Sequence, residues 1–301
     1  MFNTINKIFL LILGLFLAGA IIIAAAAFRK DSSTPVSELW RLYNSELLIV
    51  AGVLVPAYLG GIWFLLVVLV FNFRSHLEVA YVHKIKVTEP FILISLITST
   101  VVLCISDVLA ISLNFIVLLQ VVAVCAYLLV FVFLLFRKLN QYIYTTLLLC
   151  MILLSLTAII YIDSIQNGLL LIVFLFIISE TNDAFAFLFG RMFGKRRILP
   201  SISPRKTLEG LLSGILFSAF AGLMYNYFIL AYPFSVFIPV MILVLISVLS
   251  GDILFSIYKR RHNIKDFKAV LSGQGGMLDI YDSLLTSGLV FYVMLVCMHG
   301  F

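Results

Sequence analysis

Charged residues are scarce in this sequence. Only 11% of the 301 residues are Asp, Glu, Lys or Arg, whereas 63% are hydrophobic and the mean hydropathy is +1.20. A soluble domain carries about 25% charged residues, so this composition excludes one. Uncharged stretches of roughly 20 residues recur along the chain, and in lipid such stretches must be helical because each backbone amide needs an internal partner. The sequence therefore predicts an all-α, polytopic integral membrane protein with about ten transmembrane helices, some of them short or hairpin-like.

Cysteine and histidine are scarce as well. The four cysteines and four histidines show no spacing typical of a disulfide framework or a zinc site, so the cysteines are interpreted as small core residues. The net charge of +6 lies in the connections between apolar stretches, where it sets topology and can meet phosphates or lipid headgroups. This placement argues against a nucleic-acid partner.

Breaks in the apolar stretches divide the chain into expected spans. The stretch 47–73 is too long for one span and contains Pro56, Gly60 and Gly61, which predicts a hairpin of two short helices. Residues 29–45 are polar and contain Trp40 and Tyr43, which favours an interfacial segment. The other expected spans are 8–28, 90–112, 115–136, 142–162, 168–190, 210–231, 233–255 and 283–300. We group these into an N-terminal helix with an interfacial segment (1–45), N-terminal membrane helices (46–165) and a C-terminal membrane domain (166–301).

Basic residues alternate between connections. The connections at 74–89, 137–141, 191–206 and 258–268 hold almost all Lys and Arg, while those near 113, 163–167 and 232 hold none. By the positive-inside rule the basic connections face the cytoplasm, and both termini face the opposite side.

Several carboxylates lie at or near the ends of apolar stretches. Acidic groups at membrane depth are costly and usually face a polar cavity or a partner. Pairing with a neighbouring Lys or Arg is the structural alternative for each of them. The residues are Glu180 and Asp183, three apart on one helical face; Asp252, with Ser256 one turn later; and Asp279 with Asp282.

Carboxylates, basic residues and a glycine-rich turn at 272–276 are expected at one cytoplasmic face. Such a set suits a nucleoside triphosphate with a divalent metal, because Mg²⁺ prefers a few carboxylates plus phosphate oxygens. Lys and Arg would hold the remaining phosphate charge, and glycine would let the backbone approach a ligand closely.

Two blocks of sequence resemble the phosphatidate cytidylyltransferases, also called CDP-diacylglycerol synthases. The resemblance covers mainly residues 175–300. The upstream block is Asn182-Asp183, Phe189-Gly190-Arg191 and 203–210. The downstream block is Gly251-Asp252, Ser256-Ile-Tyr-Lys259-Arg260, Lys265-Asp266, Gly273-Gln274-Gly275-Gly276 and Asp279-Ile280-Tyr281-Asp282.

The resemblance implies an enzyme that converts CTP and phosphatidate to CDP-diacylglycerol and pyrophosphate. It implies Mg²⁺, a possible second, monovalent cation, membrane lipids as surroundings and a homodimer. A cytoplasmic (inner) membrane location follows from helical spans and a CTP site that faces the nucleotide pool.

Roles for individual residues follow from the matching positions. The resemblance implies catalytic and metal-binding roles for Asp252, Asp279 and Asp282, with Lys259 and Ser256 as further catalytic residues. The substrate-binding residues it implies are Asp183, Arg205, Lys206, Thr207, Arg260, Lys265, Gly275 and Gly276. Asp266 is expected either to share this site or to order the basic loop by pairing with Lys265 or Lys259.

Three positions depart from the family pattern. Ser272 replaces a usual Pro, Gln274 replaces a His, and Ile280 replaces the Arg between the paired Asp residues. Ile can neither hold a phosphate nor pair with a carboxylate. Three alternatives therefore stay open: a CTP-dependent kinase acting on a lipid alcohol, a cytidylyltransferase acting on another lipid phosphate, and a degenerate paralogue.

Overall fold

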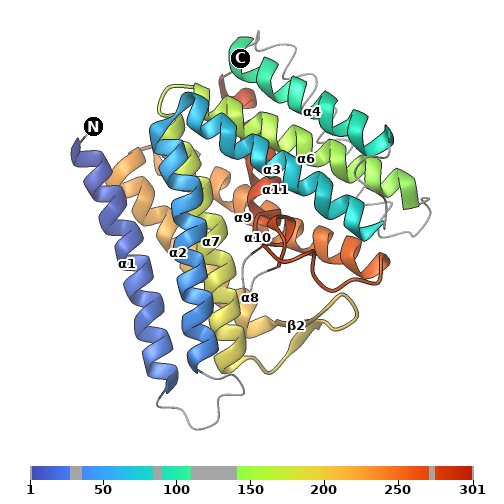
Figure 1. Ribbon diagram of the computed structural model, residues 1–301. Coiled ribbons are helices and arrows are strands. Elements are labelled where there is room, and N and C mark those ends of the chain that lie inside the picture. The colour runs from blue at the N-terminus through green and yellow to red at the C-terminus, as the bar shows by residue number, and fades with distance from the viewer. Residues whose placement is uncertain (1, 28–35, 84–89, 110–140, 271–274, 300–301) are drawn as a thin grey trace.

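The computed structural model describes residues 2–27, 36–83, 90–109, 141–270 and 275–299 (Figure 1). The described chain is all-α apart from one small hairpin, which confirms the predicted fold class. Its elements in chain order are α1 (Phe2–Ala27), α2 (Val36–Leu59), α3 (Gly61–Val82), α4 (Pro90–Leu109), α6 (Gln141–Ser164), α7 (Gly168–Phe193), β1 (Arg197–Leu199), β2 (Ser203–Thr207), α8 (Leu208–Tyr225), η1 (Asn226–Leu230), α9 (Phe234–Arg261), α10 (Met277–Ile280) and α11 (Asp282–His299).

Five of the described helices are long and apolar enough to cross a membrane. They are Gly61–Val82, Thr146–Ser164, Gly168–Phe193, Leu208–Leu230 and Phe234–Arg261, and shorter apolar helices accompany them. The protein is therefore a multi-pass membrane protein. The expected span 115–136 lies outside the described residues.

The chain turns between α2 and α3 at two glycines. Gly60 and Gly61 have φ values of 66° and 49°, a left-handed conformation that glycine adopts without steric cost. The predicted helical pair is thus confirmed, but its helices are longer than expected. Trp40 and Tyr43 belong to α2 itself, so the described part of the expected interfacial segment, from residue 36 onward, is continuous with the apolar helix.

The basic segment after α7 forms a hairpin that the sequence did not predict. Strands β1 and β2 are antiparallel, with Leu199 opposite Ser203 and Arg197 opposite Thr207. Thr207 ends the hairpin and also caps α8, because its Oγ1 accepts a hydrogen bond from the Gly210 amide at 3.2 Å. The hairpin therefore leads directly into a membrane helix, and its last strand is held beside that helix (Figure 1).

Helices α9 and α11 pack closely at Gly251. A Cβ atom on Gly251 would overlap the Thr286 side chain and lie 2.9 Å from the Asp282 carbonyl oxygen. Thr286 donates a hydrogen bond across this contact to the Ser247 carbonyl at 3.0 Å. The absence of a side chain at Gly251 brings the start of α11 against the α9 turn that carries Asp252.

Hydrogen bonds join three of the basic connections. Arg260 donates from Nε to the Ile202 carbonyl of the hairpin at 2.8 Å, and His83, after α3, lies 3.1 Å from the Tyr258 hydroxyl. The ends of α3 and α9 and the β-hairpin consequently share one face of the molecule, as the charge alternation predicted.

Candidate active site

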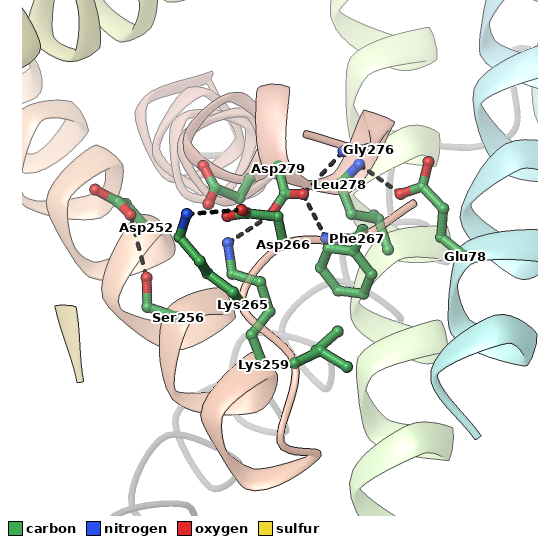
Figure 2. A network of polar contacts seen from close by, with 12 residues as sticks. Glu78, Asp252, Ser256, Lys259, Lys265, Asp266, Phe267, Gly276, Leu278 and Asp279 are labelled. Atoms are coloured by element: carbon green, nitrogen blue, oxygen red, sulfur yellow. Dashed lines mark hydrogen bonds and ion pairs between the residues drawn. The ribbon is translucent and has the colours of Figure 1, made fainter. Parts of the chain in front are cut away.

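Asp252 forms the meeting point of the two motif blocks. It lies in α9 and forms an ion pair with Lys206 of β2. One turn later in α9, Ser256 donates a hydrogen bond to the other carboxylate oxygen at 3.5 Å. Figure 2 shows Asp252 and Ser256 on the same helix. The Asp252 side chain is 29% exposed, so it remains open to a ligand while it is paired.

Two further carboxylates lie beside Asp252. Asp183 of α7 and Asp282 at the start of α11 both interact electrostatically with Asp252 and Lys206. The Ser283 hydroxyl donates to Asp282 at 3.2 Å and also hydrogen-bonds Asp183. Asp282 is buried, and its Oδ1 also accepts the Ser283 amide at 2.6 Å. Helices α7, α9 and α11 thus each contribute one carboxylate to a single centre.

A second ion pair joins Lys259 of α9 to Asp279 of α10. Lys259 Nζ lies 2.5 Å from Asp279 Oδ1, and each side chain is only 10% exposed. The other oxygen of Asp279 accepts the Phe267 amide at 2.7 Å and the Gly276 amide at 2.8 Å. The Asp279 carboxylate is therefore fully engaged by its own chain (Figure 2).

The metal ligands that the resemblance implies, Asp252, Asp279 and Asp282, stay a prediction. Within the described ranges, no group of three or more His, Cys, Asp or Glu side chains is placed to hold a metal ion. Of the three, Asp279 is directed toward Lys259 and two backbone amides. Asp183, which the sequence suggested for substrate binding and as a further metal-ligand candidate, lies beside Asp252.

The charges of the site still fit a divalent cation. Four carboxylates (Asp183, Asp252, Asp279 and Asp282) face two ammonium groups (Lys206 and Lys259), which leaves 4 − 2 = 2 negative charges when all are ionised. Like charges this close are stabilised by a cation. Mg²⁺ commonly binds one or two carboxylates and takes its other ligands from water and phosphate oxygens. A pair drawn from Asp183, Asp252 and Asp282 can meet that requirement.

Four residues that were expected to bind substrate either contact other parts of the protein or lie exposed on its surface. Thr207 caps α8, and Arg260 donates from Nε and Nη1 to the Ile202 and Ile264 carbonyls, both at 2.8 Å. Arg205 is exposed on β2. Lys265 pairs with Asp266 at 3.5 Å on the surface, which confirms one of the two expectations for Asp266.

The glycine-rich turn is described in part. Ser272, Gly273 and Gln274 lie outside the described residues, whereas Gly275 and Gly276 lead into α10. Ile280, which replaces the family Arg, is half-buried and packs against the hydrophobic core. Its side chain therefore has an apolar structural role in this protein.

Sequence reasoning left two acidic residues without a role. Glu78 of α3 is buried and accepts hydrogen bonds from the Met277 and Leu278 amides at 2.7 and 3.0 Å. Glu180 hydrogen-bonds Glu46 of α2 and also interacts electrostatically with Asp183, as their helical spacing suggested. The signal for Glu78 was an acidic residue near the end of an apolar helix, but its partners lie about 200 residues later and no spacing rule connects them.

Comparisons with known proteins agree with this geometry. The profile of the Cytidylyltransferase family matches residues 41–298. Phosphatidate cytidylyltransferase of Aquifex aeolicus is 38% identical over 160 residues, which are 52% of this chain and 59% of that protein. The uncharacterized protein YnbB of Escherichia coli is 36% identical over 137 residues, or 45% of this chain and 46% of YnbB.

A phosphatidate cytidylyltransferase of Staphylococcus aureus is 36% identical over 122 residues, which are 40% of this chain and 46% of that protein. The chain thus spans about half the length of the curated relatives it matches. The family profile, in contrast, extends from α2 through α11 and includes every residue of the carboxylate centre. On the strength of that match and of the two blocks that meet at Asp252, the chain belongs to the cytidylyltransferase family.

Proposed function

We propose that this protein transfers the cytidylyl group of CTP to phosphatidate, forming CDP-diacylglycerol and pyrophosphate in a cytoplasmic membrane. The observation that supports the proposal is the Lys206–Asp252 ion pair, in which a basic side chain of one block meets the carboxylate centre of the other. Relatives named phosphatidate cytidylyltransferase support the choice of substrates.

The reaction needs no covalent enzyme intermediate. An oxygen of the phosphatidate phosphate attacks the α-phosphorus of CTP, and a new phosphorus–oxygen bond forms as the bond to the bridging oxygen breaks. The electron pair of the broken bond leaves with pyrophosphate. The phosphate nucleophile is already ionised at neutral pH, so positioning and charge neutralisation supply the catalysis.

The residues of the site divide these tasks. Lys206 and Lys259 hold phosphate oxygens and stabilise the charge that develops on them. A pair drawn from Asp183, Asp252 and Asp282 would hold Mg²⁺, which would supply Lewis-acid neutralisation of the triphosphate. Ser256 orients the Asp252 carboxylate through its hydrogen bond. A second, monovalent cation, a homodimer and a cytoplasm-facing site are part of the same proposal.

A product assay on purified protein in detergent tests the function. We expect CDP-diacylglycerol and pyrophosphate from CTP, phosphatidate and Mg²⁺, with both products lost on addition of EDTA. Asp252→Asn serves as the inactive control. Release of CDP instead of pyrophosphate would indicate a CTP-dependent kinase, and absence of CTP binding by folded protein would indicate a degenerate paralogue.

A further inference from the structure

Glu78 connects the N-terminal helices to the glycine-rich turn of the site. It lies near the end of α3, with a relative exposure of 1%, and both of its carboxylate oxygens are used. Oε1 accepts the Met277 amide at 2.7 Å and Oε2 accepts the Leu278 amide at 3.0 Å. Figure 2 shows the Glu78 carboxylate directed at the start of α10.

The start of α10 needs an acceptor from another part of the chain. The first amides of a helix have no intrahelical partner, and a residue before the helix usually caps one of them with its side chain. Gly276 stands at that position and has no side chain. Glu78 also fills the space that a side chain at position 276 would take, because a Cβ atom on Gly276 would lie 2.5 Å from Glu78 Oε2 and 2.6 Å from its Cδ. Glu78 thus replaces the missing cap.

Glu78 and Asp279 together accept hydrogen bonds from three consecutive backbone amides of this turn. Asp279 accepts the Gly276 amide at 2.8 Å, while Glu78 accepts the next two. Asp279 is the residue that pairs with Lys259 at the site. Any shift of α10 relative to α3 therefore changes the geometry of the Lys259–Asp279 pair.

A second contact on the same face of α3 supports this arrangement. Phe71, seven residues before Glu78, packs edge to face on Tyr281, with ring centroids 5.5 Å apart. Residues seven apart lie on one helix face, so α3 contacts the segment 277–281 along two turns. Arg74 lies on this stretch as well, 3.7 Å from Glu78 Oε1, and offsets part of the buried charge.

We propose that Glu78 is a positioning residue for nucleotide binding. It touches neither the reacting atoms nor Lys259, and it acts by fixing the backbone of Gly276–Asp279 from the side opposite the site. The inference rests on the proposed function, because it assigns the fixed turn to the triphosphate of CTP. It extends the site to α3, beyond the blocks that carry the family resemblance.

The first test measures the turn itself and needs no activity. Hydrogen–deuterium exchange of Glu78→Gln and Glu78→Ala in detergent should show faster exchange at 275–281 than in the unaltered protein, with a smaller increase for Gln because its one carbonyl oxygen retains one acceptor. Ser75→Ala is the matched control, because Ser75 is buried on the same helix but bonds only its own helix, at the Phe71 carbonyl. Unchanged exchange at 275–281 in both variants would overturn the proposal.

The second test separates positioning from general stability. Both Glu78 variants should raise the KM for CTP by about 10- to 100-fold, with Gln less affected than Ala, because small displacements of binding groups have effects of this size. The KM for phosphatidate should stay within twofold of the unaltered value. A loss of kcat with both KM values unchanged would show a merely structural role. If the unaltered protein transfers no cytidylyl group, the proposed function fails, and the exchange experiment still decides whether Glu78 fixes the turn.

Discussion

Lys206 on β2 forms an ion pair with Asp252 in α9, across 46 residues of sequence. The contact requires the basic hairpin to fold back toward α9, and Thr207 fixes that path by capping α8. Each partner lies in a separate motif block, so the pair is the physical link between them. Through this pair, the basic hairpin and helix α9 contribute to one site.

Removal of either member of this pair should abolish most cytidylyl transfer. We expect Lys206→Met and Asp252→Asn each to lower kcat/KM by about 10²- to 10³-fold, because the first removes a cation that would hold phosphate oxygens and the second weakens a site that would hold Mg²⁺. The double variant should be little worse than either single variant, since the two residues act as a unit. Steady-state kinetics with CTP and phosphatidate measure this, and independent, multiplying losses would contradict a joint role.

Gly251 should be intolerant of even one methyl group. Gly251→Ala forces α9 and α11 apart, because the added Cβ overlaps Thr286, and we expect a loss of about 1–3 kcal/mol in the free energy of unfolding. Thr286→Ala in the same chain should restore part of the loss. Gly52→Ala is the control, since nothing lies within 4 Å of a Cβ atom there. Reversible unfolding in mixed micelles gives the comparison, and equal stability of Gly251→Ala and Gly52→Ala would refute the packing argument.

The buried pair Lys259–Asp279 should matter for stability as well as for activity. Lys259→Met leaves the Asp279 carboxylate buried without its cation, at an expected cost of about 3–5 kcal/mol. Lys265→Met breaks the exposed pair with Asp266 and should change stability by about 0–1 kcal/mol. Adding Asp279→Asn to Lys259→Met should recover stability without recovering transfer. If the Lys259 and Lys265 variants unfold alike, the burial of the first pair has no energetic consequence.

Ile280 should not limit the reaction. It packs against the core, and Lys206 and Lys259 already provide cations at the site. We therefore expect Ile280→Arg to destabilise the protein by about 1–3 kcal/mol, because a polar group enters an apolar contact, and to leave the rate no higher. Ile280→Leu is the size-matched control. A rate increase of tenfold or more in Ile280→Arg would show instead that the missing Arg is a defect.

Acidification should weaken the contact between the ends of α3 and α9. Burial, and then the neighbouring His262, lowers the pKa of His83 to about 4, below the ordinary 6.5 of histidine. The folded state therefore binds fewer protons than the unfolded state between these values, so the stability from neutral His83 is full above pH 6.5 and is lost as the pH falls toward 4. Thermal unfolding across this range should show a steeper decline for the unaltered protein than for His83→Gln. If the stability of both proteins declined equally with falling pH, titratable groups other than His83 would be responsible.

The sequence by itself determined the class of molecule and indicated candidate residues for the site. The low charge and long apolar stretches require membrane helices, because unpaired amides are too costly in lipid. The alternation of basic connections predicted that the ends of α3, the hairpin and α9 lie on one face, and the hydrogen bonds of Arg260 and His83 agree. These properties are local or depend on composition, so they can be read without coordinates.

Tertiary structure decided how those residues combine. Asp279 is held by Lys259 and two amides, and Asp183 lies beside Asp252. Thr207 and Arg260 hold the backbone, and Glu78 reaches the site from a helix with no motif. Such pairings join residues up to 200 positions apart. They depend on helix packing, such as the contact at Gly251, and no periodicity or spacing in the sequence encodes which of several equivalent carboxylates meets which cation.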